Sequence, residues 1–405
     1  MLTRNHNFVD KNGNPISDQA GIAYARQHLG AASYRYQHLY TPHYGVNSAA
    51  TRRWTSAYHG LPGNSDVKGA LVPRNPGGFF MHADFSQNEY RVFAALAKEE
   101  AIMQAFLEGK DIHRYIASQV FNKDEDEISD AERNMAKRLS FGLLYGKSVA
   151  AIAEEYFRGD INYAQWLFDT FFAMFPRIKV YMEAQRQMLF DQGYITTVWG
   201  DPIYLSYDAD SQSSVNEAVR YAVNYPTQST ASSIAALTGY EVVQAARSQQ
   251  WGLHIPGFIH DCLEGDIDHR SLLEVFEALP QVAEDWPYET FGLPLRLDIE
   301  IGVRGGPYLV EFKRLKGAKV FVQDGVLEAK LEGRSDAVDL LVERIRSQGQ
   351  YSVELRDVEV KEERVKWKEL YQKVAAAYRL DMGKLVQVTK AVVRIEKTST
   401  WSDHG

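Results

Sequence analysis

The alternation of apolar and polar positions predicts a strand followed by a helix in the first third of the chain. Residues 77–85 form a short, mostly apolar run behind a Pro-Gly-Gly turn, which predicts a strand. Residues 86–106 follow directly and repeat apolar positions at helical spacing, which predicts one amphipathic helix. Ser86 and Glu89 have capping-box spacing at its start. Asp84 therefore ends a strand, where a rigid element can hold its carboxylate in a cleft.

Residues 129–147 predict a second helix, which opens with Ser129 and Glu132 at capping-box spacing. One face of this helix carries two cations followed by two aromatic rings at intervals of four: Arg133, Lys137, Phe141 and Tyr145. A face that packs into a core would be apolar throughout. Cations suit a polyphosphate, and rings suit a flat base behind it. The pattern also fits an exposed cationic edge that grades into a buried aromatic one.

The remaining pattern predicts helices and strands in alternation. Residues 150–193 are helical and Phe-rich with a break at 175–176, and a long helix runs from residue 214 past residue 236. Tyr194 to Trp199 predict a strand, residues 255–268 predict two strands joined by a tight hairpin, and 295–303 predict another strand. The more highly charged C-terminal region predicts strands at 319–322, 326–331, 352–360 and 385–395 and helices at 335–347 and 362–378.

Composition describes a soluble globular protein of two or three domains. The chain has 405 residues, of which 45% are hydrophobic and 12% aromatic. It shows no signal peptide and no apolar stretch long enough to cross a membrane. A single cysteine, Cys262, excludes an internal disulfide and fits a reducing cytoplasm. The formal net charge of −8 does not exclude a nucleic-acid enzyme, because a local basic groove decides affinity.

Three segments resemble the polymerase region of DNA polymerase I-like (family A) enzymes. DFSQNEYRV at Asp84 resembles motif A, RNMAKRLSFGLLYG at Arg133 resembles motif B, and IHDC at Ile259 resembles motif C. They occur in the family's order, within residues 51–302. The resemblance implies an α+β fold with an antiparallel palm sheet and helical fingers, and it indicates a bacteriophage origin. It also implies a template-directed DNA polymerase that extends a primer 3′ end by two-metal phosphoryl transfer.

The resemblance gives each matching residue an expected role. Asp84 and Asp261 match the aspartates that bind two Mg²⁺ ions, and they are expected to act in catalysis together with Lys137. Residues at nucleotide-binding positions are Glu89, His113, Arg133, Lys137, Phe141 and Tyr145. Among them, Glu89 matches the steric gate that excludes a ribose 2′-hydroxyl. Residues at DNA-binding positions are Arg53, Arg220, Asn224, Gln228 and His260.

The chain departs from the family pattern at motif C. Cys262 stands where the family has glutamate, and a thiol is a poor ligand for Mg²⁺. Alternation along a strand places Glu264 on the same face as Cys262. Asp201-Pro202 stands where the family has an Arg-rich loop. These departures favour an alternative function, that of a catalytically weak DNA-binding or assembly subunit of a replication complex.

The expected domains follow the motifs. They are an N-terminal segment with a thumb remnant (1–50), a first palm segment (51–112), fingers (113–199), a second palm segment (200–310) and a small C-terminal α+β module (311–405). A 3′–5′ exonuclease and a full thumb are not expected in this chain, so a separate chain would carry them. The expected partners are primer–template DNA and deoxynucleoside triphosphates, with no membrane. The expected location is the cytoplasm, that of the host if a phage encodes the chain.

Overall fold

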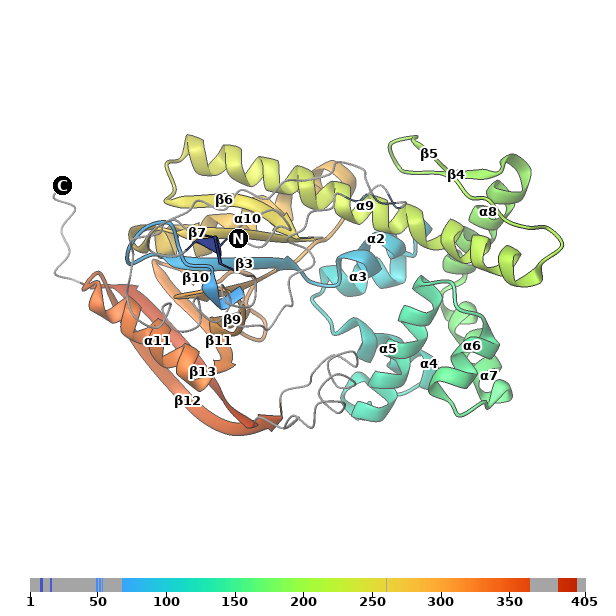
Figure 1. Cartoon of the computed structure of the whole chain (residues 1–405). Coiled ribbons are helices and arrows are strands. Elements are labelled where there is room, and N and C mark those ends of the chain that lie inside the picture. The colour runs from blue at the N-terminus through green and yellow to red at the C-terminus, as the bar shows by residue number, and fades with distance from the viewer. Residues whose placement is uncertain are drawn as a thin grey trace.

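The computed structural model describes residues 8–9, 15–16, 49, 51, 53, 68–259, 261–364 and 385–398. They form a sheet lobe and a helical lobe, and the long helix α9 (Gln212–Ser248) runs from one to the other (Figure 1). The predicted α+β class is confirmed. No helix in this described part of the chain is both long and apolar enough to cross a bilayer.

The sheet lobe is built on one antiparallel sheet. Across the described residues it has nine strands in the order β12-β13-β11-β9-β8-β3-β7-β6, with β10 paired to β11. Its strands are β3 (Phe79–Phe85), β6 (Leu253–Ile259), β7 (Cys262–Ile267), β8 (Leu297–Gly302), β9 (Leu309–Arg314), β10 (Val322–Gln323), β11 (Val326–Arg334), β12 (Tyr351–Arg364) and β13 (Leu385–Lys397). Two small pairs lie outside it, β1 (Phe8–Val9) with β2 (Pro15–Ile16) and β4 (Tyr194–Thr196) with β5 (Pro202–Tyr204). Strand β3 lies inside the large sheet, between β7 and β8.

Alternation along the strands separates an apolar face from a polar face. On β3, Phe79, Met81, Ala83 and Phe85 are buried in a core that also contains residues of α9, α10 (Leu272–Phe291) and α11 (Ser335–Ser347). His82 and Asp84 alternate with these residues and are only partly buried. The sheet therefore has helices on its apolar face and presents titratable side chains on the other.

The residues after 311 extend this sheet and share its core. Helix α11 forms at the predicted residues and packs with β8 and α10 in the same hydrophobic cluster. Tyr351 Oη donates to the carbonyl of Arg270 at 2.9 Å, which ties β12 to the start of α10. The boundary predicted between residues 310 and 311 falls within β9. The C-terminal region, red and orange in Figure 1, is consequently continuous with β8 and β3 of the same sheet.

The predicted start of the helix at 362–378 is wrong. Residues 362–364 belong to β12, where Glu362 pairs with Gln387 of β13. The two strands continue pairing because each offers an unbroken run of extended residues, and twelve register pairs join them despite one irregularity near Arg356. Residues 365–378 of the predicted helix lie outside the described residues, as does the N-terminal segment apart from β1, β2 and residue 49.

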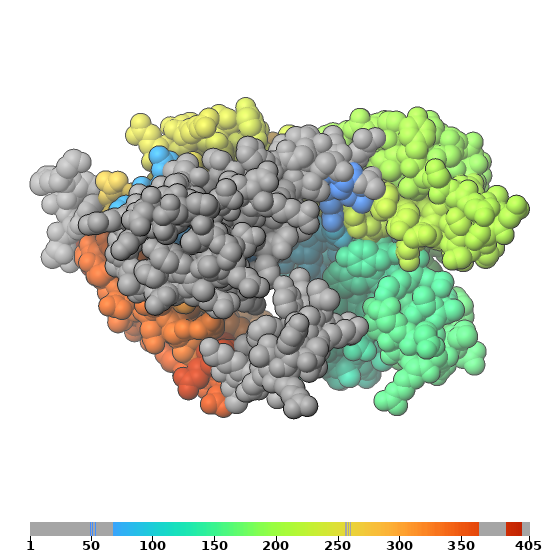
Figure 2. Space-filling model, viewed as in Figure 1, coloured from blue at the N-terminus to red at the C-terminus, as the bar shows by residue number. Residues whose placement is uncertain are grey.

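The helical lobe contains seven helices in the described residues. They are α2 (Asn88–Ala97), α3 (Glu100–Leu107), α4 (Ile112–Phe121), α5 (Asp130–Leu144), α6 (Val149–Tyr156), α7 (Ile161–Met174) and α8 (Pro176–Gln192). In the space-filling view the green helices of this lobe and the orange C-terminal elements lie on opposite sides of the molecule (Figure 2). The second predicted helix is confirmed as α5, and so is its capping box: Ser129 Oγ accepts from the Glu132 amide at 3.3 Å, and the Glu132 carboxylate accepts from the Ser129 amide at 2.9 Å.

The helix predicted at 86–106 is two helices. Lys98 adopts a left-handed φ of 54° and ends α2, so α3 starts in a new direction. The predicted capping box of Ser86 and Glu89 is also wrong. Gln87 is the N-cap, its φ is 54°, and it makes no side-chain capping bond. Glu89 is therefore free of a capping role and lies in the first turn of α2.

Candidate active site

The sheet register brings Asp84 and Asp261 together. Asp84 at the end of β3 pairs with Cys262, the first residue of β7, and Asp261 precedes it in the turn after β6. The Phe85 amide donates to the Asp261 carbonyl at 3.2 Å, which fixes this turn against β3. Two strands that are remote in sequence thus deliver two carboxylates to the same end of the sheet.

The Asp261 carboxylate disfavours the charged form of Asp84. Burial, and next the neighbouring Asp261 carboxylate, raises the pKa of Asp84 to about 7. Burial also raises the pKa of Asp261. Burial and a neighbouring negative charge both disfavour the ionised form of a carboxyl group. Such a pair fits a divalent cation, which would remove the repulsion.

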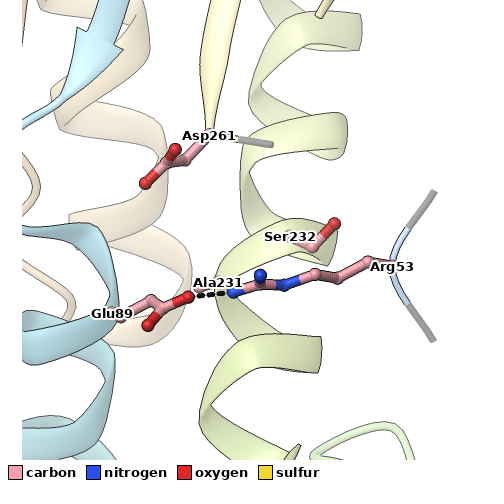
Figure 3. Close-up of a pocket in the computed structure, with 5 residues that line it drawn as sticks. All are labelled: Arg53, Glu89, Ala231, Ser232 and Asp261. Atoms are coloured by element: carbon pink, nitrogen blue, oxygen red, sulfur yellow. Dashed lines mark hydrogen bonds and ion pairs between the residues drawn. The ribbon is translucent and has the colours of Figure 1, made fainter. Parts of the chain in front are cut away.

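Glu89 lies beside this pair in a small pocket. The pocket holds about 170 Å³ and is lined by Arg53, Glu89, Ala231, Ser232 and Asp261. Figure 3 shows Glu89 of α2 facing Arg53, with Asp261 at the strand end and the two small residues on α9. Buried Asn88 donates to the Ala231 carbonyl at 3.3 Å, which fixes the start of α2 against α9. Glu89 and Asp261 line the same pocket.

Glu89 is held by two partners. The Arg53 guanidinium forms an ion pair with one carboxylate oxygen, and Tyr145 Oη donates to the other at 3.2 Å. Burial lowers the pKa of Arg53 although the Asp261 carboxylate opposes this. The two contacts join residues that the sequence placed in separate groups, one for DNA and one for the nucleotide.

The face predicted on α5 divides into two halves. Phe141 stacks on Tyr145, which is the C-cap residue just after the helix, with ring centroids 6.3 Å apart. The His113 ring of α4 lies 5.6 Å from the Phe141 ring, and burial lowers the pKa of His113 to about 4. His113 is consequently neutral at physiological pH. Tyr145 thus connects the aromatic end of this face to Glu89 of the pocket.

The cationic end of α5 faces solvent and α4. Arg133 Nε donates at 2.7 Å to Asp111, which caps α4 through the amides of His113 and Arg114. Lys137 is exposed. Arg133, which is partly exposed, and Lys137 are thus accessible on the surface of the helical lobe.

The residues predicted to bind DNA have different surroundings. Asn224 is 5% exposed and donates to the Leu144 carbonyl at 3.2 Å, which joins α9 to the end of α5. Arg220 pairs with Glu217 at 3.3 Å and lies against Gly146. Gln228 is half-buried, and His260 lies outside the described residues. DNA binding by these residues remains a prediction.

Cys262 belongs to a cluster behind Asp84. Its Sγ lies 3.1 Å from Nδ1 of His82, and the same nitrogen lies 3.1 Å from the Glu264 carboxylate. Lys68 Nζ is 3.6 Å from Glu264. The prediction that Glu264 shares the face of Cys262 is confirmed, since both pair with β3 residues of the polar face. His82 was missed, although its place two residues before Asp84 in a strand puts it on the same face.

Burial and the neighbouring carboxylates determine the protonation of Cys262 and His82 in this cluster. Burial raises the pKa of the Cys262 thiol well above its usual range, so the thiol stays protonated. Burial opposes a charged His82, but the hydrogen bond to Glu264 and the surrounding carboxylates raise its pKa overall. The cluster is therefore a hydrogen-bonded support that links β3 to β7.

A sheet that carries paired carboxylates at adjacent strand ends, beside a helical lobe with a cationic and aromatic helix, is the palm-and-fingers architecture of a polymerase. Residues 61–305 match the family described as DNA polymerase family A, and the chain belongs to this family. Enzymes of the family generally use divalent metal ions. The family predicted from motifs A, B and C is thus confirmed.

Curated relatives match different lengths of the chain. DNA polymerase I of Pseudomonas aeruginosa is 35% identical over 161 residues, which are 39% of this chain and 18% of that protein. The thermostable DNA polymerase I of Thermus filiformis is 30% identical over 228 residues, or 56% and 26%. DNA polymerase I of Aquifex aeolicus is 31% identical over 248 residues, which are 59% of this chain and 41% of that protein. The chain therefore spans less than half of each of these relatives.

The fold also resembles a solved structure, the POL domain of Pol1 from M. smegmatis in complex with DNA primer-template and dNTP. The TM-score is 0.58 at 25% identity, over 65% of this chain and 47% of that one. The sheet lobe and the helical lobe of this chain consequently have the palm and fingers fold.

Proposed function

We propose that the chain is a template-directed DNA polymerase that adds deoxynucleotides to a primer 3′ end. The observation that carries this proposal is that Asp84 and Asp261 lie at the same end of neighbouring strands, beside the Glu89 pocket. Polymerisation is attack of a primer hydroxyl on the α-phosphate of a nucleotide, which needs alignment and charge neutralisation more than covalent help.

Asp84 and Asp261 would hold the metal, which we propose is a pair of Mg²⁺ ions. Their hard carboxylate oxygens, and the charge that Asp261 places beside Asp84, fit such ions. Among the described residues, no three His, Cys, Asp or Glu side chains could hold an ion alone, so water and substrate phosphates would complete the coordination. When bound, the ions lower the pKa of the attacking hydroxyl and neutralise the leaving pyrophosphate.

The helical lobe would hold the nucleotide. Arg133 and Lys137 offer positive charge to the triphosphate, and neutral His113 can donate one hydrogen bond to it. The stacked rings of Phe141 and Tyr145 offer an apolar surface to the sugar and base. Lys137, which is exposed, would move toward the phosphates when the helical lobe closes.

Glu89 would discriminate against ribonucleotides. The Arg53 and Tyr145 contacts hold its carboxylate in place, so a 2′-hydroxyl would meet a fixed side chain. The residues that would contact the primer–template duplex are Arg53, Arg220, Asn224, Gln228 and His260. The reaction would take place in the cytoplasm, and a separate chain with a thumb or an exonuclease would be a further partner.

Primer extension by the purified chain tests this function. Wild type should extend a primed DNA template with deoxynucleotides and Mg²⁺, whereas Asp84→Ala and Asp261→Ala should reduce extension by several orders of magnitude while keeping affinity for the duplex. Lys316→Ala, in the exposed turn after β9, is a control that should retain activity.

The alternative is a catalytically weak DNA-binding or assembly subunit. One observation favours it, because Cys262 is buried against His82 and offers no carboxylate to the metal site. In that case wild type would bind primer–template but extend it no faster than Asp84→Ala. That outcome would reject the polymerase proposal.

A further inference from the structure

Asp84 has a titratable neighbour on each side of its strand. In the register of the sheet, its Cα pairs with Cys262 of β7 on one side and with Asp298 of β8 on the other. Directly opposed residues of antiparallel strands point to the same face, with Cβ atoms about 4.5–5.5 Å apart. Cys262, Asp84 and Asp298 therefore form one row across the polar face of three adjacent strands.

Cys262, at one end of this row, does not supply a ligand to the metal site. Its side chain is 3% exposed, and its Sγ contacts His82 in the next row. A neutral thiol is also a poor partner for a hard divalent ion. In this chain β7 therefore has no carboxylate at the position opposite Asp84, where the family resemblance expects one.

Asp298 has the opposite properties. It alternates with the buried Leu297 and Ile299, so it lies on the polar face and is only partly buried. Its charge acts on Asp84, since it is among the carboxylates that disfavour ionisation there. Among the hydrogen bonds and ion pairs of the described residues, none involves its carboxylate, whereas Glu264 of the neighbouring strand is held by His82 and Lys68.

We propose that Asp298 of β8 supplies the third carboxylate of the metal site. It would replace the glutamate that the family resemblance expects at position 262 of β7, on the other side of Asp84. This inference rests on the polymerase function proposed above. Because no three such side chains of the described residues converge closely enough to hold an ion alone, Asp298 acts through water bound to the ion. It is a positioning residue that accepts hydrogen bonds from that water and adds negative charge beside Asp84.

Mn²⁺ binding to the full chain, followed by the electron paramagnetic resonance signal of free Mn²⁺, tests the inference without relying on catalysis. Asp84→Asn should abolish the tightest site. Asp298→Asn should weaken it by about 10- to 100-fold, as loss of an outer-shell partner does. Glu300→Gln is the matched control, because Glu300 lies on the same strand and face one row away, opposite His82. It should change the affinity less than about threefold, in line with a weak screened charge effect.

The outcomes separate the two proposals. Wild-type affinity in Asp298→Asn, with loss in Asp84→Asn, would overturn the role of Asp298 and leave the polymerase proposal intact. Equal loss of Mn²⁺ affinity in Asp298→Asn and Glu300→Gln would also overturn it, since the loss would then reflect the removal of any nearby negative charge. Absence of any Asp84-dependent site in wild type would overturn the metal site itself. Far-ultraviolet circular dichroism of each variant confirms that the isosteric changes keep the fold.

Discussion

Replacing Asp84 with asparagine should make the metal-free protein more stable at neutral pH and remove some of its pH dependence. The change keeps the shape of the side chain and removes one of the two carboxylates at this end of the strands. In the folded protein, burial and Asp261 raise the pKa of Asp84 from 3.8 to about 7. A carboxyl group that is harder to ionise in the folded than in the unfolded chain costs stability wherever it is ionised.

The sign and size of the effect follow from that pKa. Well below the unfolded pKa of 3.8 the group is protonated in both states and costs nothing, whereas above the folded pKa of about 7 it is ionised in both and the full cost applies. The displacement from 3.8 to about 7 corresponds to about 4 kcal/mol. Between pH 5 and pH 7, the free energy of unfolding of wild type should therefore fall by about 2 kcal/mol relative to Asp84→Asn.

Urea unfolding of wild type and variant at half-unit steps from pH 5 to pH 8, without divalent ions, measures this difference. Asp339→Asn on the exposed side of α11 is the control, and its curve should run parallel to wild type. Millimolar Mg²⁺ at pH 8 should stabilise wild type more than Asp84→Asn. Parallel curves for wild type and Asp84→Asn would refute the reasoning, because they would mean that the two carboxylates do not meet in a desolvated site.

Three further substitutions test the surroundings of this site. Glu89→Ala should raise ribonucleotide incorporation relative to deoxynucleotide incorporation, measured as the ratio of kcat/KM values, and an unchanged ratio would place Glu89 away from the sugar. Phe141→Tyr should relax discrimination against dideoxynucleotides by about 10- to 100-fold, the equivalent of one hydrogen bond of about 1–3 kcal/mol, in the same assay. Cys262→Glu should lower the free energy of unfolding by about 2 kcal/mol or more, because it places a larger, charged side chain at a position that is 3% exposed; urea unfolding at or above wild-type stability would contradict that.

Local sequence signals predicted the elements that carry the site. The strand before Asp84, the capping box of α5 and the hairpin around Asp261 all depend on residues within a few positions of one another, and each formed as predicted. The break at Lys98 could not be read from the pattern, because a lysine carries no signal for a left-handed φ. Tertiary packing of α2 and α3 decided it.

Contacts between distant segments were beyond reach of the sequence. The Glu89 contacts to Arg53 and Tyr145 span 36 and 56 residues, and the Cys262 contact to His82 spans 180. The pairing of Asp84 with Asp298 depends on the register of two strands, which local periodicity does not specify. Most residues of the site could therefore be named from the sequence, but not which of them touch.

The continuous sheet also has a consequence for how the chain acquires its activity during synthesis. Strand β3, which carries Asp84, pairs with β7 and β8, about 180 and 215 residues later, and β8 pairs on its other side with β9, beyond which β11 and β13 follow. Pairings this remote in sequence form late, since a large loop must close before they gain anything. Helix α11, which covers the apolar face of the later strands, is made only after residue 335. A nascent chain that has reached only residue 305, where the family match ends, would leave one side of β8 unpaired, so this neighbour of β3 gains its second pairing partner only after residues 309–314 have been made.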